Sequence, residues 1–333
     1  MDRIIRIPQA GAPPELASQP CPAPGEGELR VRLHAAALNF ADLLMVDGRY
    51  QDTPPYPFVA GIEGAGVVEA AGPGATLAPG TRVAVSGQGT LADRGVFAQD
   101  ACVPIPDRMP MEAAAGFLVA YGTSHLALTG PGALAAGQTL AVLGAGGGVG
   151  LTAVEIGAAL GARVIAVARG AGKLAAARRA GAAELIDSAE TADLRAALRA
   201  MGGVDVLYDA LGDAPAEAAF GALRHGGRHL LIGFAAGKPP ALPLNHALVK
   251  NIAIHGFYWG GYRTLAPERL RASLDALLTL QEAGRLRPAP PTVLPLEDAA
   301  QAYDLLRGRG VVGKVVLSIA PEPAGPAPAP ARG

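Results

Sequence analysis

Cysteine, aromatic residues and long apolar runs without glycine are scarce in this sequence. Its 333 residues include two cysteines, Cys21 and Cys102, which are far apart and in no metal-ligand spacing. Two thiols cannot build a disulfide framework or a four-cysteine zinc lobe, so we expect reduced cysteines in a cytoplasmic protein. The apolar runs contain glycine and are too short to span a bilayer, and the charged start MDRIIRIPQA lacks the apolar segment of a signal peptide.

An excess of charge of either sign is also missing. Lysine and arginine total 28, aspartate and glutamate total 29, and the formal net charge is −1. This balance gives no electrostatic reason to expect a nucleic acid or an acidic membrane as partner. Half of the residues are hydrophobic and 17% are charged, so the chain can bury a large core, and its length favours two domains.

The first 115 residues have the pattern of an irregular β-rich domain. Residues 28–38 alternate apolar and polar side chains, as a half-buried strand does, and residues 40–48 predict a short helix ended by Gly48. Residues 121–258 instead alternate strands with helices, which indicates a parallel doubly wound sheet. The expected strands are 138–144, 162–168, 183–188, 204–211, 228–234 and 251–257. The expected helices are 148–161, 172–181, 191–200 and 215–227.

The last part of the chain predicts helices over 266–284 and 296–310 and a closing strand over 311–319. Because six strands already complete the doubly wound sheet, we expect these elements to return to the first domain. The sequence therefore predicts a β-rich domain, a doubly wound domain and a loose tail rich in proline and alanine. Their expected ranges are, in that order, 1–120 with 259–320, 121–258 and 321–333.

The strongest local motif is VLGAGGGVG, residues 142–150, which follows an expected strand and opens an expected helix. This context favours a dinucleotide-binding turn, because glycines let the backbone approach a pyrophosphate and the helix N-terminus offers it N–H groups. Gly147 and Gly150 stand at the second and third glycine positions of the usual fingerprint, and Ala145 stands at the first. A flexible loop without a ligand is the alternative. The expected cofactor contacts of this turn are Ala145, Gly147, Gly148, Val149 and Gly150.

The residue that closes the second expected strand selects the nicotinamide cofactor. An NAD site has Asp or Glu there to bind the ribose hydroxyl groups, whereas this chain has Ala168, followed by Arg169 and Lys173. Two cations suit a 2′-phosphate, so the sequence predicts NADP(H) rather than NAD(H). The alternative is that both are ordinary solvated charges.

Along nearly its whole length the chain resembles the zinc-independent quinone oxidoreductase (zeta-crystallin-like) branch of the medium-chain dehydrogenase/reductase superfamily. The matching stretches are ALNFADLLMVDGRY (37–50), GIEGAGVVEAAGPG (61–74), GTRVAV (80–85), AYGTSHLAL (120–128), GAGGGVG (144–150), VDVLYDALG (204–212), GGRHLLIGF (226–234) and GKVVL (313–317). The resemblance implies a Rossmann domain beside a GroES-like catalytic domain, with NADP(H) and substrate in the cleft between them. It also implies a homodimer built through the cofactor domains.

The resemblance further implies that no metal takes part. In zinc-dependent relatives the ligands would fall at Asn39, at Ile62 and near Val119, and none of these binds zinc as a thiolate or an imidazole does. The chain departs from the branch at Ser188, where a tyrosine near the cofactor phosphate is common, and at Arg169, where a small residue is frequent.

By the same resemblance, Asn39, Tyr50 and Thr123 face the nicotinamide and the substrate. The Asn39 amide can donate to a developing oxyanion, Tyr50 can donate a hydrogen bond or a proton or can stack on the substrate, and Thr123 positions the ring. The structural alternatives are a turn cap, a packing residue and a helix hydroxyl. We expect Asp42 and Glu63 to be satisfied by backbone N–H groups or arginine rather than to act as a catalytic pair.

Aromatic side chains concentrate in HGFYWGGY, residues 255–262, at the end of the last expected strand. Tyr258 and Trp259 are therefore candidates for an aromatic wall beside a flat substrate, with core packing as the alternative. The remaining expected cofactor contacts are Gly233, Phe234, Phe257 and Lys314.

Together with the resemblance, these patterns predict an NADPH-dependent, metal-free reductase that transfers hydride to a small-molecule quinone. A quinone needs little electrophilic help, whereas an unactivated ketone needs a Lewis acid or a strong general acid. Two alternatives stay open. One is an enoyl reductase of enones (α,β-unsaturated ketones) or enoyl thioesters, and the other is an NADPH-binding structural or RNA-binding protein, which the balanced charge disfavours.

Overall fold

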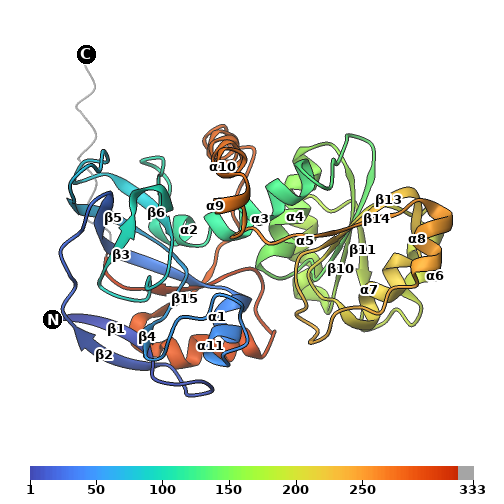
Figure 1. Ribbon diagram of the computed structural model, residues 1–333. Coiled ribbons are helices and arrows are strands. Elements are labelled where there is room, and N and C mark those ends of the chain that lie inside the picture. Colours follow the sequence, from blue (N-terminus) through green and yellow to red (C-terminus); the bar gives the residue numbers. More distant parts are fainter. Residues whose placement is uncertain (322–333) are drawn as a thin grey trace, which may run out of the picture. The chain divides into compact units, whose positions relative to one another are not determined.

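The computed structural model describes residues 1–321, which form two compact units (Figure 1). The first unit contains Met1–Gly116, Val293–Gly308 and the described residues from Val315 onward. The second unit contains Phe117–Thr292 and Arg309–Lys314. The tail predicted for 321–333 lies outside the described residues except for Pro321.

The second unit is built on a parallel sheet of six strands in the order β11-β10-β9-β12-β13-β14. The strands are β9 (Thr139–Leu143), β10 (Arg163–Ala168), β11 (Glu184–Asp187), β12 (Val204–Asp209), β13 (Leu223–Leu231) and β14 (Ala253–Gly256). The order reverses between β9 and β12, and sheets of this kind bind ligands at the carboxyl ends of the strands beside such a point. The doubly wound sheet predicted from the sequence is confirmed.

Helices cover both faces of this sheet, as Figure 1 shows for α4 and α7. On one face α4 packs through Gly157, whose missing side chain leaves room for Leu140. The other face carries Ala141, which shares a buried cluster with Leu198 of α6 and Phe220 of α7. The helices of the unit are α3 (Leu118–Thr129), α4 (Gly148–Ala159), α5 (Ala171–Arg179), α6 (Leu194–Ala200), α7 (Asp213–Phe220), α8 (Leu244–Lys250), α9 (Tyr262–Leu265) and α10 (Pro267–Glu282).

The first unit is β-rich, as expected of a GroES-like domain. One sheet has the order β15-β16-β3-β5-β6-β8 with β7 also paired to β3, and a smaller sheet has the order β2-β1-β4. The alternation in β3 places Leu29, Val31 and Leu33 fully in the core. The elements are β1 (Asp2–Ile7), β2 (Glu15–Gln19), β3 (Glu28–Leu38), α1 (Phe40–Val46), β4 (Phe58–Val59), β5 (Glu63–Ala71), β6 (Arg82–Ser86), β7 (Arg94–Ala98), η1 (Gln99–Ala101), β8 (Cys102–Pro104), α2 (Met111–Ala115), β15 (Thr292–Pro295), η2 (Leu296–Asp298), α11 (Ala299–Arg307) and β16 (Val315–Ser318).

The boundary between the units differs from the one expected at residue 258. Residues 259–292 belong to the second unit, because α10 packs against α3, buries Leu277 completely and places Ser273 Oγ 2.7 Å from His125 Nδ1. The segment 309–314 also belongs there. An amphipathic pattern predicts that a helix has a buried face, but it does not identify the domain against which that face packs.

The helix expected over 215–227 is also shorter than the sequence pattern indicates. α7 ends at Phe220, and β13 already begins at Leu223. Gly226 has φ +71°, and the register between β12 and β13 shifts nearby, so the strand bends at its glycine pair. In the sequence alone, that glycine pair resembles the end of a helix.

Candidate active site

The glycine-rich turn joins β9 to α4 in the second unit. Gly144 has φ +73°, a conformation that glycine adopts readily, and its N–H and that of Ala145 both donate to the Val167 carbonyl at 3.1 Å. A Cβ on Gly150 would lie 2.1 Å from the Gly144 carbonyl oxygen, so the turn closes against α4 only because residue 150 is glycine. Gly147 precedes the helix as its N-cap. The result is a compact backbone at a helix N-terminus, which suits a pyrophosphate.

The tight bend lies one residue earlier than the sequence fingerprint indicated. Ala145 is fully buried, and the positive φ belongs to Gly144. The sequence contained this signal, because Gly144 directly follows the apolar strand. Gly148 and Val149 lie, as expected, in the first turn of α4.

Two lysine side chains cross the glycine turn. A Cβ on Gly146 would lie 2.5 Å from Lys173 Cβ, and a Cβ on Gly148 would lie 2.9 Å from Lys314 Cδ. The Lys314 segment reaches the turn because Gly313 N–H donates to the Gly146 carbonyl at 2.9 Å. Both cations are thus positioned by glycines that leave room for their aliphatic stems.

A cluster of three cations, Arg169, Lys173 and Arg309, gathers near the end of β10. Lys173 Nζ donates to the Arg309 carbonyl. Burial lowers the pKa of Lys173, and the positive charges of Arg169 and Arg309 lower it further. Arg169 and Arg309 are exposed. Sequence reasoning missed Arg309, whose one unusual local feature, a φ of +54°, becomes visible only in the structure.

An acid beside this strand end, Asp187, binds backbone N–H groups. Asp187 closes β11 beside Ala168 of β10. Its carboxylate accepts from Gly170 N–H at 3.2 Å and from Ala189 N–H at 2.9 Å. Asp187 therefore stabilises the start of the loops after the two strands, and Ala168 holds the position at which an NAD site has its acid.

Thr123 lies in α3 and is 7% exposed. The next residue, Ser124, belongs to a buried hydroxyl network in which its Oγ lies 2.9 Å from Tyr208 Oη, 2.7 Å from Thr152 Oγ1 and 3.0 Å from the Val149 carbonyl oxygen. Burial raises the pKa of Tyr208, so the phenol stays neutral. This network, which sequence reasoning missed, joins α3 to the first turn of α4 and fixes Thr123 relative to the glycine turn.

The aromatic segment after β14 is divided between core and surface. Phe257 and Trp259 are both 7% exposed, whereas Tyr258 is 42% exposed. The Phe257 ring centroid lies 5.3 Å from that of Tyr262, and the Trp259 indole lies against Gly122 of α3. Trp259 therefore packs beside the helix that carries Thr123.

Gly233 and Phe234 follow β13 and approach the loop after β12. Gly233 N–H donates to the Asp209 carbonyl at 3.3 Å, and the Phe234 ring lies against Gly212. The Asp209 carboxylate accepts from two N–H groups of that loop and lies 3.0 Å from His229 Nε2, with both side chains fully buried. This buried pair therefore supports the loop after β12.

Asn39 and Tyr50 belong to the first unit. Asn39 is the N-cap of α1, its backbone N–H donates to Asp42 Oδ2 at 2.7 Å, and its Nδ2 donates to Glu63 Oε1 at 3.0 Å. Glu63 is fully buried, so it fixes the orientation of the Asn39 amide. The prediction of a backbone partner is confirmed for Asp42, whereas Glu63 binds a side-chain amide.

Tyr50 is half-buried in the turn that follows α1. The Tyr50 carbonyl accepts from the backbone N–H of Thr53 at 3.2 Å and from the Thr53 hydroxyl at 2.7 Å. Gly48, which was expected to end the helix, precedes this turn with φ +66°. The backbone around Tyr50 is therefore held by local hydrogen bonds.

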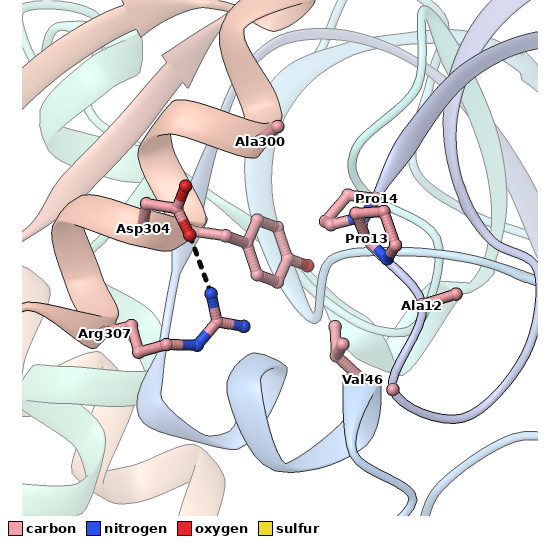
Figure 2. Close-up of a pocket in the computed structure, with 9 residues that line it drawn as sticks. Ala12, Pro13, Pro14, Val46, Ala300, Asp304 and Arg307 are labelled. Carbon is pink, nitrogen blue, oxygen red and sulfur yellow. Dashed lines mark hydrogen bonds and ion pairs between the residues drawn. The ribbon is translucent and has the colours of Figure 1, made fainter.

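A cavity of about 290 Å³ opens in the first unit between the loop after β1, α1 and α11 (Figure 2). Asp304 and Arg307 form an ion pair at 2.7 Å on its α11 side. None of the expected catalytic or cofactor residues lines this cavity, so we do not assign it to the active site. Its lining residues are Gly11, Ala12, Pro13, Pro14, Val46, Ala300, Tyr303, Asp304 and Arg307.

Within residues 1–321 no three His, Cys, Asp or Glu side chains come together in a way that could hold a metal ion. In the same part of the chain no helix is both long and apolar enough to cross a membrane.

Comparison with known proteins gives matches over both units. Residues 25–111 match the family described as "Alcohol dehydrogenase GroES-like domain", and residues 148–279 match the family described as "Zinc-binding dehydrogenase". The quinone oxidoreductase-like protein 2 homolog of Nematostella vectensis is 34% identical over 300 residues, which cover 88% of this chain and 82% of the relative.

Solved structures show the same similarity. The quinone oxidoreductase of Thermus thermophilus, whose complex with NADPH is known, superposes with a TM-score of 0.85 at 34% identity and covers 95% of this chain and 100% of its own. The Escherichia coli quinone oxidoreductase complexed with NADPH superposes with a TM-score of 0.88 at 26% identity, with coverage of 95% and 100%.

Proposed function

Since the chain belongs to the quinone oxidoreductase-like branch of the medium-chain dehydrogenase/reductase superfamily, we propose that it is an NADPH-dependent reductase that transfers hydride to quinones without a metal. The choice of NADPH as cofactor is supported by the cluster of Arg169, Lys173 and Arg309 near the end of β10. These cations suit a 2′-phosphate, and Ala168 supplies no acid that would repel it.

The glycine turn fits the rest of the dinucleotide. Backbone N–H groups at the start of α4 donate to the pyrophosphate, and Lys314 adds positive charge over Gly148. The expected contacts at Gly233, Phe234 and Phe257 extend this surface along the ends of β13 and β14. Bound NADPH supplies the hydride, so the protein has to orient the reactants and exclude water.

The side chains proposed to act on the substrate are Asn39, Tyr50 and Thr123. The amide of Asn39, held by Glu63, donates to the quinone oxygen on which negative charge develops. Tyr50 donates a second hydrogen bond or stacks on the ring, and Thr123 positions the nicotinamide from α3. The residues at the zinc-ligand positions of relatives, Asn39, Ile62 and Val119, supply no thiolate or imidazole.

A direct test is NADPH oxidation by the purified protein with quinones, enones and enoyl thioesters as acceptors. We expect the highest kcat/KM with quinones. Preference for an enone or an enoyl thioester would replace the proposal with an enoyl reductase. Tight NADPH binding without turnover of any acceptor would indicate a binding protein instead.

We also propose a homodimer formed through the second unit. β14 stands at the end of the six-strand order, and α8, which packs beside β13, exposes Leu244, Leu248 and Val249 at 66%, 78% and 65%. Large exposed apolar side chains near a sheet edge favour burial against a second copy. Light scattering should give twice the chain mass for the wild type and the single mass for Leu248→Glu. A monomeric wild type would contradict the dimer.

A further inference from the structure

Trp259 is the single tryptophan of the chain, and its indole sits in a notch of α3. A Cβ on Gly122 would lie 2.6 Å from the indole Nε1 and 2.8 Å from Cε2, closer than real side chains approach. Glycine inside a helix is less stable than alanine, so residue 122 gives up helix stability where it admits the indole edge. The notch therefore positions one particular side chain.

The indole N–H of Trp259 donates to no acceptor among residues 1–321, although the residue is only 7% exposed. A buried donor without an acceptor is destabilising, and native proteins keep few of them. Phenylalanine would fill the same apolar space without burying a hydrogen-bond donor. The polar edge of the indole thus points to an acceptor that a bound molecule supplies.

The neighbours of the indole define the chemistry of that acceptor. Gly122 directly precedes Thr123, and Ser124 ties this part of α3 to the start of α4. The guanidinium carbon of Arg263 lies 5.9 Å from the centroid of the Trp259 ring, and a cation over the indole strengthens its N–H as a donor. A donor strengthened in this way suits an electron-rich oxygen such as that of a carbonyl group.

We propose that the Trp259 N–H donates a hydrogen bond to a carbonyl oxygen of a ligand bound at the active site. The proposal rests on the function proposed above, because both the nicotinamide carboxamide and a quinone present such an oxygen. Trp259 is then a binding residue that orients one of the two reacting rings, and Gly122 is the residue that makes room for it.

The test uses protein labelled with ¹⁵N-tryptophan, whose NMR spectrum contains one indole N–H resonance. If the acceptor is the carboxamide, saturating NADPH alone moves the indole proton downfield. If the acceptor is the quinone, the shift appears only when quinone is added to the protein with NADP⁺, a mixture that cannot turn over. An indole proton that does not move downfield in either complex overturns the proposal.

Variants give a second readout. Trp259→Phe keeps an aromatic ring beside Gly122 but removes the N–H donor. It should lower the affinity for the ligand that shifts the resonance by about three- to tenfold, the range of one neutral hydrogen bond. Gly122→Ala should lower the affinity for the same ligand, because the added methyl group displaces the indole. Gly172→Ala, in a helix where a Cβ meets no atom within 4 Å, is the matched control and should change neither affinity. Unchanged affinity for both ligands in Trp259→Phe overturns the proposal.

An independent titration of wild-type protein with NADPH distinguishes failure of the proposed function from failure of the tryptophan contact alone. Absence of NADPH binding removes the proposed function and the tryptophan contact together. Normal NADPH binding and quinone turnover with an unresponsive indole removes only the tryptophan contact.

Discussion

The glycine turn of the second unit and the Asn39 site of the first unit are built in opposite ways. The turn depends on side chains that are missing, because Gly144 adopts a positive φ and Gly150 lets two backbone segments meet. The Asn39 site depends on a buried side chain, Glu63, which holds the donor amide from 24 residues away. We therefore expect crowding to disable the turn completely, whereas changes at Asn39 should lower turnover in steps.

The largest expected effect is that of Gly150→Ala. Its Cβ would lie 2.1 Å from the oxygen and 2.7 Å from the carbon of the Gly144 carbonyl, and backbone atoms cannot move aside cheaply. We expect the free energy of unfolding to fall by about 3 kcal/mol, with loss of NADPH binding. Thermal unfolding and an NADPH titration measure both effects, with Gly172→Ala as the control. A Gly150→Ala protein with wild-type affinity would show that the turn is not the cofactor site.

Asn39→Ala tests the other side of the comparison. Loss of a donor to a developing oxyanion should lower kcat about a hundredfold, while the NADPH dissociation constant stays within about twofold. Glu63→Gln keeps an acceptor for the Asn39 amide but removes the charge, so kcat should fall less. Steady-state kinetics combined with a cofactor titration separate the two quantities. A loss confined to NADPH affinity would move Asn39 from the substrate to the cofactor.

Arg309→Ala tests whether the cation cluster binds the 2′-phosphate of NADPH. Loss of one charge-assisted contact should lower the affinity for NADPH about tenfold and leave the affinity for NADH unchanged. Arg307→Ala is the matched control, because Arg307 lies two residues earlier and pairs with Asp304. Titrations of the three proteins with both cofactors give the comparison. Equal losses for NADPH and NADH would indicate a general electrostatic or structural effect.

The smallest expected effect is the pH dependence that Lys173 introduces. Its pKa lies below the usual 10.5 because of burial and the charges of Arg169 and Arg309. A 2′-phosphate prefers the protonated lysine, so NADPH affinity should be full below the lowered pKa and should decline as pH rises through it. Stability should rise with pH between the lowered pKa and 10.5, because the unfolded chain then binds more protons than the folded one.

A titration series that runs from neutral pH toward the usual lysine pKa of 10.5 should show NADPH affinity falling in the wild type. Lys173→Gln should be weaker overall but flat over this range. A pH profile that Lys173→Gln leaves unchanged would assign the effect to another group.

Sequence reasoning found the features that depend on neighbours along the chain. The six strands follow from apolar runs between glycines. Arg169 is visible because it directly follows Ala168, which closes its strand. Arg309 was not visible, because it meets Lys173 across 136 residues. The Gly122 notch was missed for the same reason. A sequence pattern predicts which face of a helix is buried, but the partner of that face is set by packing.

The most direct test of the central claim is the ratio of the NADPH and NADH dissociation constants of the wild-type protein, measured at low and at moderate salt. The cation cluster predicts that NADPH binds at least about tenfold more tightly and that the ratio narrows as salt screens the charges. Equal affinities, or tighter binding of NADH, would contradict the assignment of Arg169, Lys173 and Arg309 to the 2′-phosphate.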